Sequence, residues 1–491
     1  MESSDADPAY WSATQQAEEL RQRRISAVEL LDRAIYRIER FDERINAVVV
    51  RDFEQARVAA RAADNLLKSN DHLPLLGIPM TVKESFNVSG LPSTWGFPQA
   101  RGYLPAEDSV VAQRLKAVGA VIIGKTNVAT ALSDWQSFNA VYGTTNNPWD
   151  LSRSPGGSSG GSAAALAAGL VPLEVGSDLR GSLRVPAHYC GVFGHKPTHG
   201  IVPLRGHVPP GAEALPNNPD LAVAGPLARC AEDLALAMKV LAGPDIPDSI
   251  GLRLDLPVSR HSRLQDFRIL VLTDHPLISI SVETGEAVDQ LASRLMRIGA
   301  TLSRDSTLVP DLEQTATCYT RLFMSFSASF WPVETYDRVK AMILAAPADL
   351  VQRRNQRAFG AVLSHRDWIV ADQLRASLRK RWQNLFQEFD VVICPTMPTV
   401  ALPHDQSPDR EARRIELNDV EMCYEDQDPW LTIASMCGFP STVAPIGYST
   451  SGLPIGVQII APHMGDQTSI AFAGLIEREF GGFSPPPMSW A

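Results

Sequence analysis

Residues 147–162 read Asn-Pro-Trp-Asp-Leu-Ser-Arg-Ser-Pro-Gly-Gly-Ser-Ser-Gly-Gly-Ser, and the stretch ends in an unbroken run of glycine and serine. Glycine permits backbone angles that other residues avoid and lets neighbouring groups approach the main chain closely. An apolar, helical stretch at 162–169 follows at once, so the loop is anchored at its far side rather than being a flexible linker. Gly156–Gly160 also spells the G-x-S-x-G elbow, but that elbow needs a buried strand before its serine, and a turn-rich loop stands there instead.

On both sides of this loop, short apolar segments alternate with helical ones. Strands are expected at 78–82, 120–123 and 173–175, each bounded by glycine or proline. Helices are expected between them, at 110–118 and 163–168. This alternation indicates an α/β layer fold.

The two ends of the chain differ from this centre. Residues 1–70 are expected to be largely helical, with a capping box at Ser26 and Glu29. Residues 230–390 are mostly helical in pattern, and no break in composition forces a domain boundary, although length alone suggests about three domains. Strand-like segments that could return to the same sheet lie at 391–393, 442–444 and 455–459.

The composition is that of a globular, enzyme-sized protein: 491 residues, 45% hydrophobic, 20% charged and a net charge of −10. The acidic balance argues against a nucleic-acid or anionic-membrane partner, since both need a basic face. The longest apolar run, 163–173, is far shorter than the ~20 residues of a membrane span, and no signal peptide is visible. The six cysteines show no C-x₂-C spacing, so we expect no structural zinc site and reduced thiols in a cytoplasmic protein.

Gly119–Thr126 matches the spelling of a phosphate-binding P-loop. A phosphate cradle needs a strand, then a flexible loop, then a helix, so that backbone N–H groups converge on the anion. Here the residues between Gly119 and Gly124 are apolar and favour a strand, and a helix precedes Gly119. The segment is therefore predicted to be a strand and not a nucleotide site.

Two further polar residues lie at the ends of predicted strands. Lys83 follows the strand at 78–82; a lysine there usually reaches solvent, but a buried one has a lowered pKa and can act as a neutral base. Ser182 lies in the small-residue segment 176–186, where a serine hydroxyl and nearby backbone N–H groups can converge to form an oxyanion hole.

Together these segments resemble the amidase signature family: Ser182 lies 24 residues after Ser158, and Lys83 lies 75 residues before it. Other matching segments are 122–127, 147–162, 190–197, 394–398 and 452–458. The resemblance implies an α/β fold: one large domain with a central mixed, mostly parallel, twisted sheet that helices cover on both faces. Its expected parts are an N-terminal helical region (1–70), a signature core with the catalytic residues (75–200), a region that shapes the substrate pocket (230–390) and a return to the core sheet (391–491).

The resemblance also assigns roles to the three polar residues. Ser182 would be the nucleophile, Ser158 a bridging serine and Lys83 the base, because a serine hydroxyl needs a base to attack an amide. The family aligns this relay with a cis peptide, here Gly157–Ser158, and needs no metal or organic cofactor. The backbone N–H groups of the implied oxyanion hole are those of Leu179, Arg180, Gly181 and Ser182, and the implied supporting residues are Gly157, Ser159 and Asp178.

Arg180 departs from the family, which commonly has two glycines before the nucleophile. We expect its side chain to narrow or polarise the pocket, unless it points away into a salt bridge. The other candidate pocket residues are Trp135 and four aromatic residues, for which a core-facing helix stripe is the alternative: Tyr319, Phe323, Phe326 and Phe330. Three histidines near Ser182 are interpreted as packing residues rather than catalytic ones: His188, His195 and His199.

The resemblance therefore implies an amidohydrolase that cleaves the C–N bond of small-molecule amides, with apolar or aryl amides favoured and aryl esters or carbamates as further substrates. We expect a monomer or a homodimer. Two alternatives remain open: an amidotransferase subunit for a partner-bound acyl-tRNA, and a catalytically silent binding or scaffold protein. The chain shows no basic face for tRNA, and the retention of all three polar residues argues against a silent protein.

Overall fold

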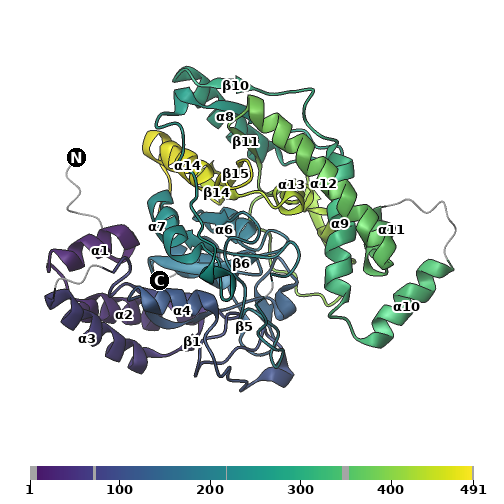
Figure 1. Ribbon diagram of the computed structural model, residues 1–491. Helices are drawn as coiled ribbons and strands as arrows, with labels where there is room; N and C mark the ends of the chain where they lie inside the picture. Colours follow the sequence, from purple (N-terminus) through teal and green to yellow (C-terminus); the bar gives the residue numbers. More distant parts are fainter. Residues whose placement is uncertain (1–7, 70–72, 217, 346–352, 489–491) are drawn as a thin grey trace.

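The computed structural model describes residues 8–69, 73–216, 218–345 and 353–488 (Figure 1). Among these residues, eleven strands form one central sheet. In order across the sheet they are β1 (Val48–Arg51), β3 (Val121–Thr126), β2 (Pro79–Lys83), β6 (Leu173–Asp178), β8 (Val223–Ala228), β7 (Phe193–Lys196), β14 (Ser441–Tyr448), β15 (Pro454–Ile460), β11 (Val391–Pro395), β9 (Arg268–Val271) and β10 (Thr301–Ser303). Two small hairpins lie outside it, β4 (Phe138–Asn139) with β5 (Gly143–Thr144) and β12 (Arg414–Leu417) with β13 (Val420–Cys423).

Helices surround this sheet, with α1 to α3 at one end of the molecule and α9 to α12 at the other (Figure 1). Ser26 and Glu29 form the capping box that the sequence predicts at the start of α2. The bounds are α1 (Ala13–Arg21), α2 (Ala27–Ile45), α3 (Phe53–Lys68), α4 (Val110–Ala117), α5 (Gly160–Ala167), α6 (Arg184–Cys190), α7 (Ala231–Leu241), α8 (Val282–Arg297), α9 (Leu312–Ala328), α10 (Val333–Leu344), α11 (Arg353–Ala361), α12 (His365–Glu388), α13 (Pro429–Cys437) and α14 (Asp466–Phe480).

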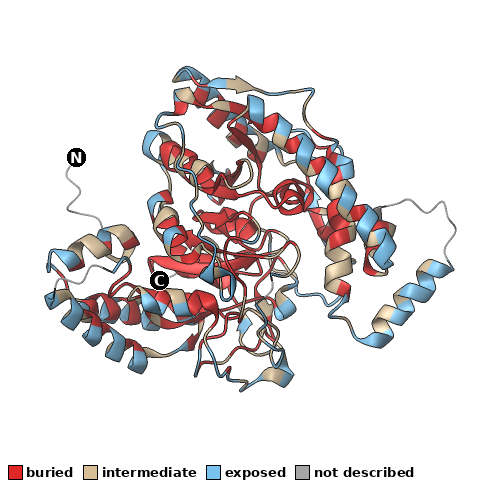
Figure 2. Cartoon of the chain, in the orientation of Figure 1, coloured by how far each residue is buried: buried red, intermediate tan, exposed pale blue. Residues whose placement is uncertain are grey.

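The central strands are covered on both faces. Every residue of β2, β6, β7, β8, β11 and β15 is buried, which a strand achieves only when helices or loops pack on both sides of the sheet (Figure 2). The expected single α/β domain with a mixed sheet is confirmed, and the three domains suggested by length are not found. No helix among the described residues is long and apolar enough to cross a membrane.

The expectation of a mostly parallel sheet is wrong. Four neighbouring pairs are parallel, β2 with β3 and β6, and β9 with β10 and β11, whereas six pairs are antiparallel. A parallel pair needs a crossover connection, while strands joined without one pair antiparallel. The short turn at 449–453 therefore makes β14 and β15 a hairpin. The segment that joins β7 to β8 has no helix among its described residues, and these two strands are likewise antiparallel.

The P-loop spelling at Gly119–Thr126 lies in strand β3, as its apolar residues predict. Lys125 is fully buried there, and its Nζ donates a hydrogen bond of 2.6 Å to Ser93 Oγ. The lysine therefore faces the protein interior and not a phosphate.

Glu174 in β6 gives a first testable prediction. It is fully buried opposite Thr81, whose hydroxyl donates to it, and burial raises the pKa of Glu174 from 4.5 to about 8. The folded protein therefore holds this carboxyl protonated between pH 4.5 and 8, whereas the unfolded chain ionises it, so stability falls as the pH rises through this range. Glu174→Gln is expected to remove that loss and to raise the free energy of unfolding by roughly 3 kcal/mol at pH 7.

Urea unfolding of Glu174→Gln and the parent protein at pH 5 and pH 7.5 checks this. The gain is expected at the higher pH, and an equal difference at both pH values contradicts a neutral, buried Glu174.

Candidate active site

Lys83 is the last residue of β2 and is fully buried. Its Nζ lies 2.7 Å from Ser158 Oγ and 2.9 Å from Ser177 Oγ, and 3.5 Å from the Ser177 carbonyl oxygen. Ser177 is a residue of the site that the sequence patterns do not reveal. The signal for it is weak: a serine next to a buried acidic residue at the end of strand β6.

The surroundings of Lys83 favour an uncharged amine. Burial lowers the pKa of Lys83 from 10.5 to about 7, and the negative charge of Asp178 opposes this only in part. A neutral amine carries two hydrogens and one lone pair, and a carbonyl oxygen can only accept a hydrogen bond. If the two hydrogens point to the oxygens of Ser177, the lone pair is directed at the Ser158 hydroxyl, which is the orientation a base requires.

The loop that carries Ser158 is held tightly. The Gly157–Ser158 peptide is cis, as the resemblance implies. Gly156 has φ +86°, and a Cβ there would lie 2.8 Å from the Pro186 Cα, so this loop packs directly on helix α6. Ser137 fixes the loop from the other side, since its hydroxyl donates to the Gly156 carbonyl at 3.0 Å and accepts from the Gly160 N–H at 2.9 Å.

Ser182 lies in the turn between β6 and α6, with 8% of its surface exposed. Asp178 shapes this turn: its carboxylate accepts from the N–H groups of Gly181 at 2.7 Å and Leu183 at 3.1 Å. Burial alone would raise the pKa of Asp178, but the ion pair with Arg184 at 3.0 Å outweighs it and holds that pKa below its ordinary value. Asp178 is thus an ionised support for the turn.

The structure therefore brings Lys83 and Ser158 into hydrogen-bond distance and places Ser182 in the neighbouring turn. Ser159, one residue after Ser158, donates to the Ser177 carbonyl at 3.3 Å, which ties the serine–glycine loop to β6. Within the described chain, the Ser182 hydroxyl makes no hydrogen bond. Catalytic hydrogen bonds are often long in the absence of substrate and tighten when it binds.

The implied oxyanion hole needs one correction. Of its four implied N–H donors, that of Gly181 is already bound to the Asp178 carboxylate. The N–H groups of Leu179, Arg180 and Ser182 meet no acceptor in the described part of the protein. The turn itself requires glycine at 181, where φ is +89° and a Cβ would lie 2.5 Å from Leu431 Cδ1.

The carbonyl groups of the same turn are held by two aromatic residues from the predicted pocket set. The Tyr319 hydroxyl donates to the Leu179 carbonyl at 2.9 Å, and the Trp135 indole N–H donates to the Arg180 carbonyl at 2.9 Å. Both side chains are buried, Tyr319 to 1% exposure and Trp135 to 5%. They pack beneath the turn rather than along an open wall.

The remaining aromatic candidates form two ring pairs, one on α9 and one that joins α9 to Phe330, two residues past the end of that helix. Phe323 stacks on Tyr319, with ring centroids 5.7 Å apart and planes inclined by 13°. Phe326 contacts Phe330, whose side chain is 60% exposed. The structure thus leaves Phe323 beside the Arg180 guanidinium and Phe330 exposed to solvent.

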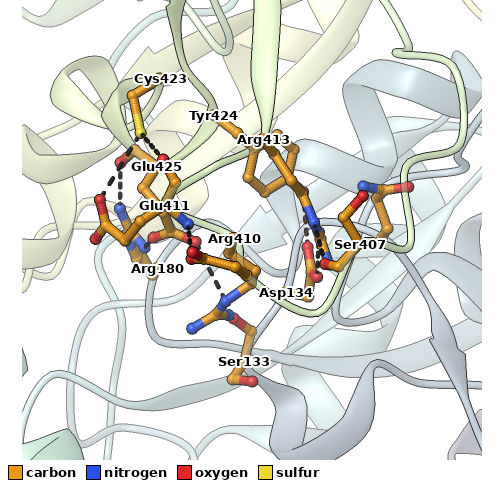
Figure 3. Close-up of polar contacts among 12 residues, drawn as sticks. Ser133, Asp134, Arg180, Ser407, Arg410, Glu411, Arg413, Cys423, Tyr424 and Glu425 are labelled. Atoms are coloured by element: carbon orange, nitrogen blue, oxygen red, sulfur yellow. Dashed lines mark hydrogen bonds and ion pairs between the residues drawn. The ribbon is translucent and has the colours of Figure 1, made fainter.

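Arg180 points into a salt bridge, the exception to the expectation that its side chain narrows or polarises the pocket. Its guanidinium lies 2.6 Å from Glu425 and 2.6 Å from Asp428, and stacks over Trp135 with its Cζ 4.3 Å from the ring centroid. Figure 3 shows this contact at one end of a polar cluster that also joins Arg413 to Asp134. The positive charge of Arg180 is therefore compensated before any substrate binds.

None of the three histidines near Ser182 joins the site. His188 accepts a hydrogen bond from the Gly456 N–H, His195 contacts Asp466 and His199 contacts the Pro219 carbonyl. A different histidine, His207, contacts Ser85 Oγ at 3.0 Å. Burial, together with the charge of Lys83, lowers the pKa of His207 to about 3. His207 is therefore neutral at physiological pH.

A cavity of about 630 Å³ lies elsewhere, lined by residues that include Arg375, Arg379 and His463, and it contains none of Lys83, Ser158 and Ser182. No group of three His, Cys, Asp or Glu side chains in the described ranges is placed to hold a metal ion.

The chain is similar to several known proteins. A family model described as Amidase matches residues 29–470. The chain is 30% identical to a glutamyl-tRNA(Gln) amidotransferase subunit of Rippkaea orientalis, over 89% of this chain and 91% of that protein. It is 33% identical to AmiB2 of Mycobacterium bovis, a protein named as a candidate amidase, over 96% of each. A solved structure described as a vestigial protein complex that reveals the origins of an s-triazine catabolic enzyme matches with a TM-score of 0.79 and 30% identity, over 95% of this chain and 98% of that one.

Proposed function

Because the chain belongs to the amidase signature family, we propose that it hydrolyses the C–N bond of small-molecule carboxylic amides through an acyl-enzyme on Ser182. The observation that carries this proposal is the 2.7 Å contact between Lys83 Nζ and Ser158 Oγ in a fully buried setting. A buried amine with a pKa near neutrality is a base at physiological pH, and it faces a hydroxyl that can pass on a proton.

The proposed reaction follows from these groups. Ser182 Oγ attacks the carbonyl carbon while its proton passes to Ser158 and the Ser158 proton passes to Lys83. The carbonyl oxygen becomes an oxyanion, which backbone N–H groups of the turn at 179–182 stabilise. When the C–N bond breaks, the leaving amine takes the proton back through Ser158. Water then hydrolyses the acyl-enzyme by the same relay, which releases the carboxylic acid and restores Ser182.

We further propose apolar or aryl amides as the preferred class, with aryl esters and carbamates as additional substrates. The Phe323 ring lies against the Arg180 guanidinium, whose charge is balanced by Glu425 and Asp428. A site with aromatic groups and compensated charges suits an uncharged, apolar acyl or amine group.

A substrate screen with purified protein tests the proposal. Acyl anilides, primary amides, carbamates and p-nitrophenyl esters are compared, and mass spectrometry identifies the acylated residue. We expect turnover of aryl amides and an acyl adduct on Ser182. If none of these classes is turned over and none forms an adduct, a silent binding protein would be the better description.

The amidotransferase role is a comparable second candidate, because several relatives of this chain are named as glutamyl-tRNA(Gln) amidotransferase subunits. The net charge of −10 makes direct binding of tRNA by this chain unfavourable, so such a role would depend on partner proteins. Release of ammonia from glutamine at a rate above that for acyl anilides would favour this function over the first.

Arg180 offers a prediction about selectivity. Arg180→Gly removes the cation that Glu425 and Asp428 share in a mostly buried site, so we expect a loss of about 3 kcal/mol in the free energy of unfolding. It also leaves negative charge beside the turn, so the KM for a cationic p-nitroanilide should fall relative to that for a neutral one. Urea unfolding and paired KM measurements check both effects.

Arg180→Lys is the matched control, since it keeps the charge and should keep the ratio of the two KM values. Unchanged selectivity in Arg180→Gly would show that the guanidinium does not influence the substrate.

A further inference from the structure

We propose that Tyr319 is a positioning residue that aims one specific N–H group, that of Arg180, at the oxyanion. The inference rests on the proposed function, because it concerns the turn that would stabilise the charge developed on the substrate. It assigns Tyr319 a role different from that of a pocket wall.

The peptide that joins Leu179 to Arg180 sets the direction of this N–H group. In a trans peptide, the carbonyl of one residue and the N–H of the next point in opposite directions within one rigid plane. This peptide is trans, and the Tyr319 hydroxyl donates to the Leu179 carbonyl at 2.9 Å. The Arg180 N–H therefore points away from Tyr319, and it meets no acceptor among the described residues.

The next peptide in the chain makes an instructive contrast. Its carbonyl, on Arg180, accepts from the Trp135 indole, and its N–H, on Gly181, donates to Asp178 at 2.7 Å. The carbonyl and the N–H of that peptide are therefore both hydrogen-bonded within the protein. The peptide that joins Leu179 to Arg180 is held only through its carbonyl, which leaves the Arg180 N–H fixed in direction and available as a donor. Backbone N–H groups in protein interiors almost always have a partner. Arg180 is partly buried, so an N–H held in this way is available to a ligand group.

Tyr319 is suited to this task because its hydroxyl is a permanent, rigid donor. The residue is 1% exposed, and burial raises the pKa of Tyr319 well above its ordinary value, so the phenol stays protonated. Its ring stacks on Phe323, and its helix α9 packs against α13, whose Leu431 touches Gly181. The side chain of Arg180 is anchored separately by Glu425 and Asp428, so the backbone of this residue is fixed from two directions.

Tyr319→Phe tests the proposal because it removes only the hydroxyl. Complete loss of one oxyanion donor typically lowers the rate 10²–10³-fold. Tyr319→Phe leaves the Arg180 N–H in place but less well oriented, so we expect kcat to fall by about 10-fold and KM to change less than about 2-fold. A trifluoromethyl ketone, which forms a tetrahedral adduct with the serine, should lose affinity by the same factor as kcat/KM falls. The affinity for the carboxylate product should not change.

Tyr189→Phe is the matched control, since that buried hydroxyl has no hydrogen-bond partner within the described ranges. It should retain parent values of kcat and of ketone affinity. All rates are expressed per Ser182 labelled by a fluorophosphonate, so a partly misfolded sample does not imitate the effect. An unchanged kcat for Tyr319→Phe, or a raised KM at constant kcat, would overturn the positioning role. Absence of labelling in the parent protein would instead overturn the proposed function.

Discussion

Ser182→Ala is expected to lower kcat/KM for amide substrates by at least about 10⁴-fold and to abolish covalent labelling by a fluorophosphonate. The reason is that no other hydroxyl in the described part of the site has the same surroundings. Ser182 lies in a turn whose N–H groups at Leu179 and Arg180 remain available, while Ser158 is 1% exposed and faces Lys83. Initial rates with an acyl anilide and intact-mass spectrometry after labelling provide the measurement.

Ser152→Ala is the control for this substitution. It lies in the same 147–162 stretch, but it is exposed and its hydroxyl donates to Asp150 at 2.7 Å. Its rate and labelling should match those of the parent protein. A Ser182→Ala protein that still forms a stoichiometric adduct would place the nucleophile elsewhere.

Lys83→Met is expected to lower kcat for amides by at least about 10³-fold, because the serine relay then has no acceptor for its proton. Activated esters expel their leaving group more easily, so the kcat for an activated ester should fall less than the kcat for an amide. In the parent protein the active form is the uncharged amine, whose pKa is about 7, so kcat/KM should rise with pH and reach half its plateau near that value. Rate measurements between about pH 5 and pH 9 with one amide and one ester test both statements.

Lys125→Met is a demanding control. Lys125 is as buried as Lys83 and lies in the adjacent strand, but its Nζ binds Ser93 and the Pro92 carbonyl instead of Ser158 and Ser177. Per labelled active site, that variant should keep the parent's pH midpoint. An amide rate for Lys83→Met within a few-fold of the parent would remove Lys83 from the role of base.

The residues that could be predicted from the sequence are those whose environment is set locally. Lys83 ends a strand of apolar residues, and the glycines around Ser158 leave room for close packing, so both the burial of the lysine and the tight loop follow from neighbours in the chain. The α/β layers could be predicted for the same reason, because each strand and helix carries its own pattern of apolar residues.

The features that escaped prediction depend on residues distant in the chain. Tyr319 reaches the Leu179 carbonyl across 140 residues, and Arg180 meets Asp428 across 248. Nothing near either residue specifies such a partner, so the sequence alone indicates a pocket or core position for Tyr319 and leaves the direction of the Arg180 side chain open. The excess of antiparallel pairs likewise depends on which strands become neighbours, and a strand's own sequence carries little of that information.

These distant contacts have a consequence for how the protein is made. Lys83, Ser158 and Ser182 all emerge from the ribosome with the first two-fifths of the chain, but Tyr319, Asp428 and Leu431 emerge much later. Until they do, the turn around Ser182 lacks the hydroxyl that holds the Leu179 carbonyl and the carboxylate that pairs with the Arg180 side chain. A chain that ends before these residues would thus carry every side chain of the proposed relay and still lack contacts that fix the turn around Ser182.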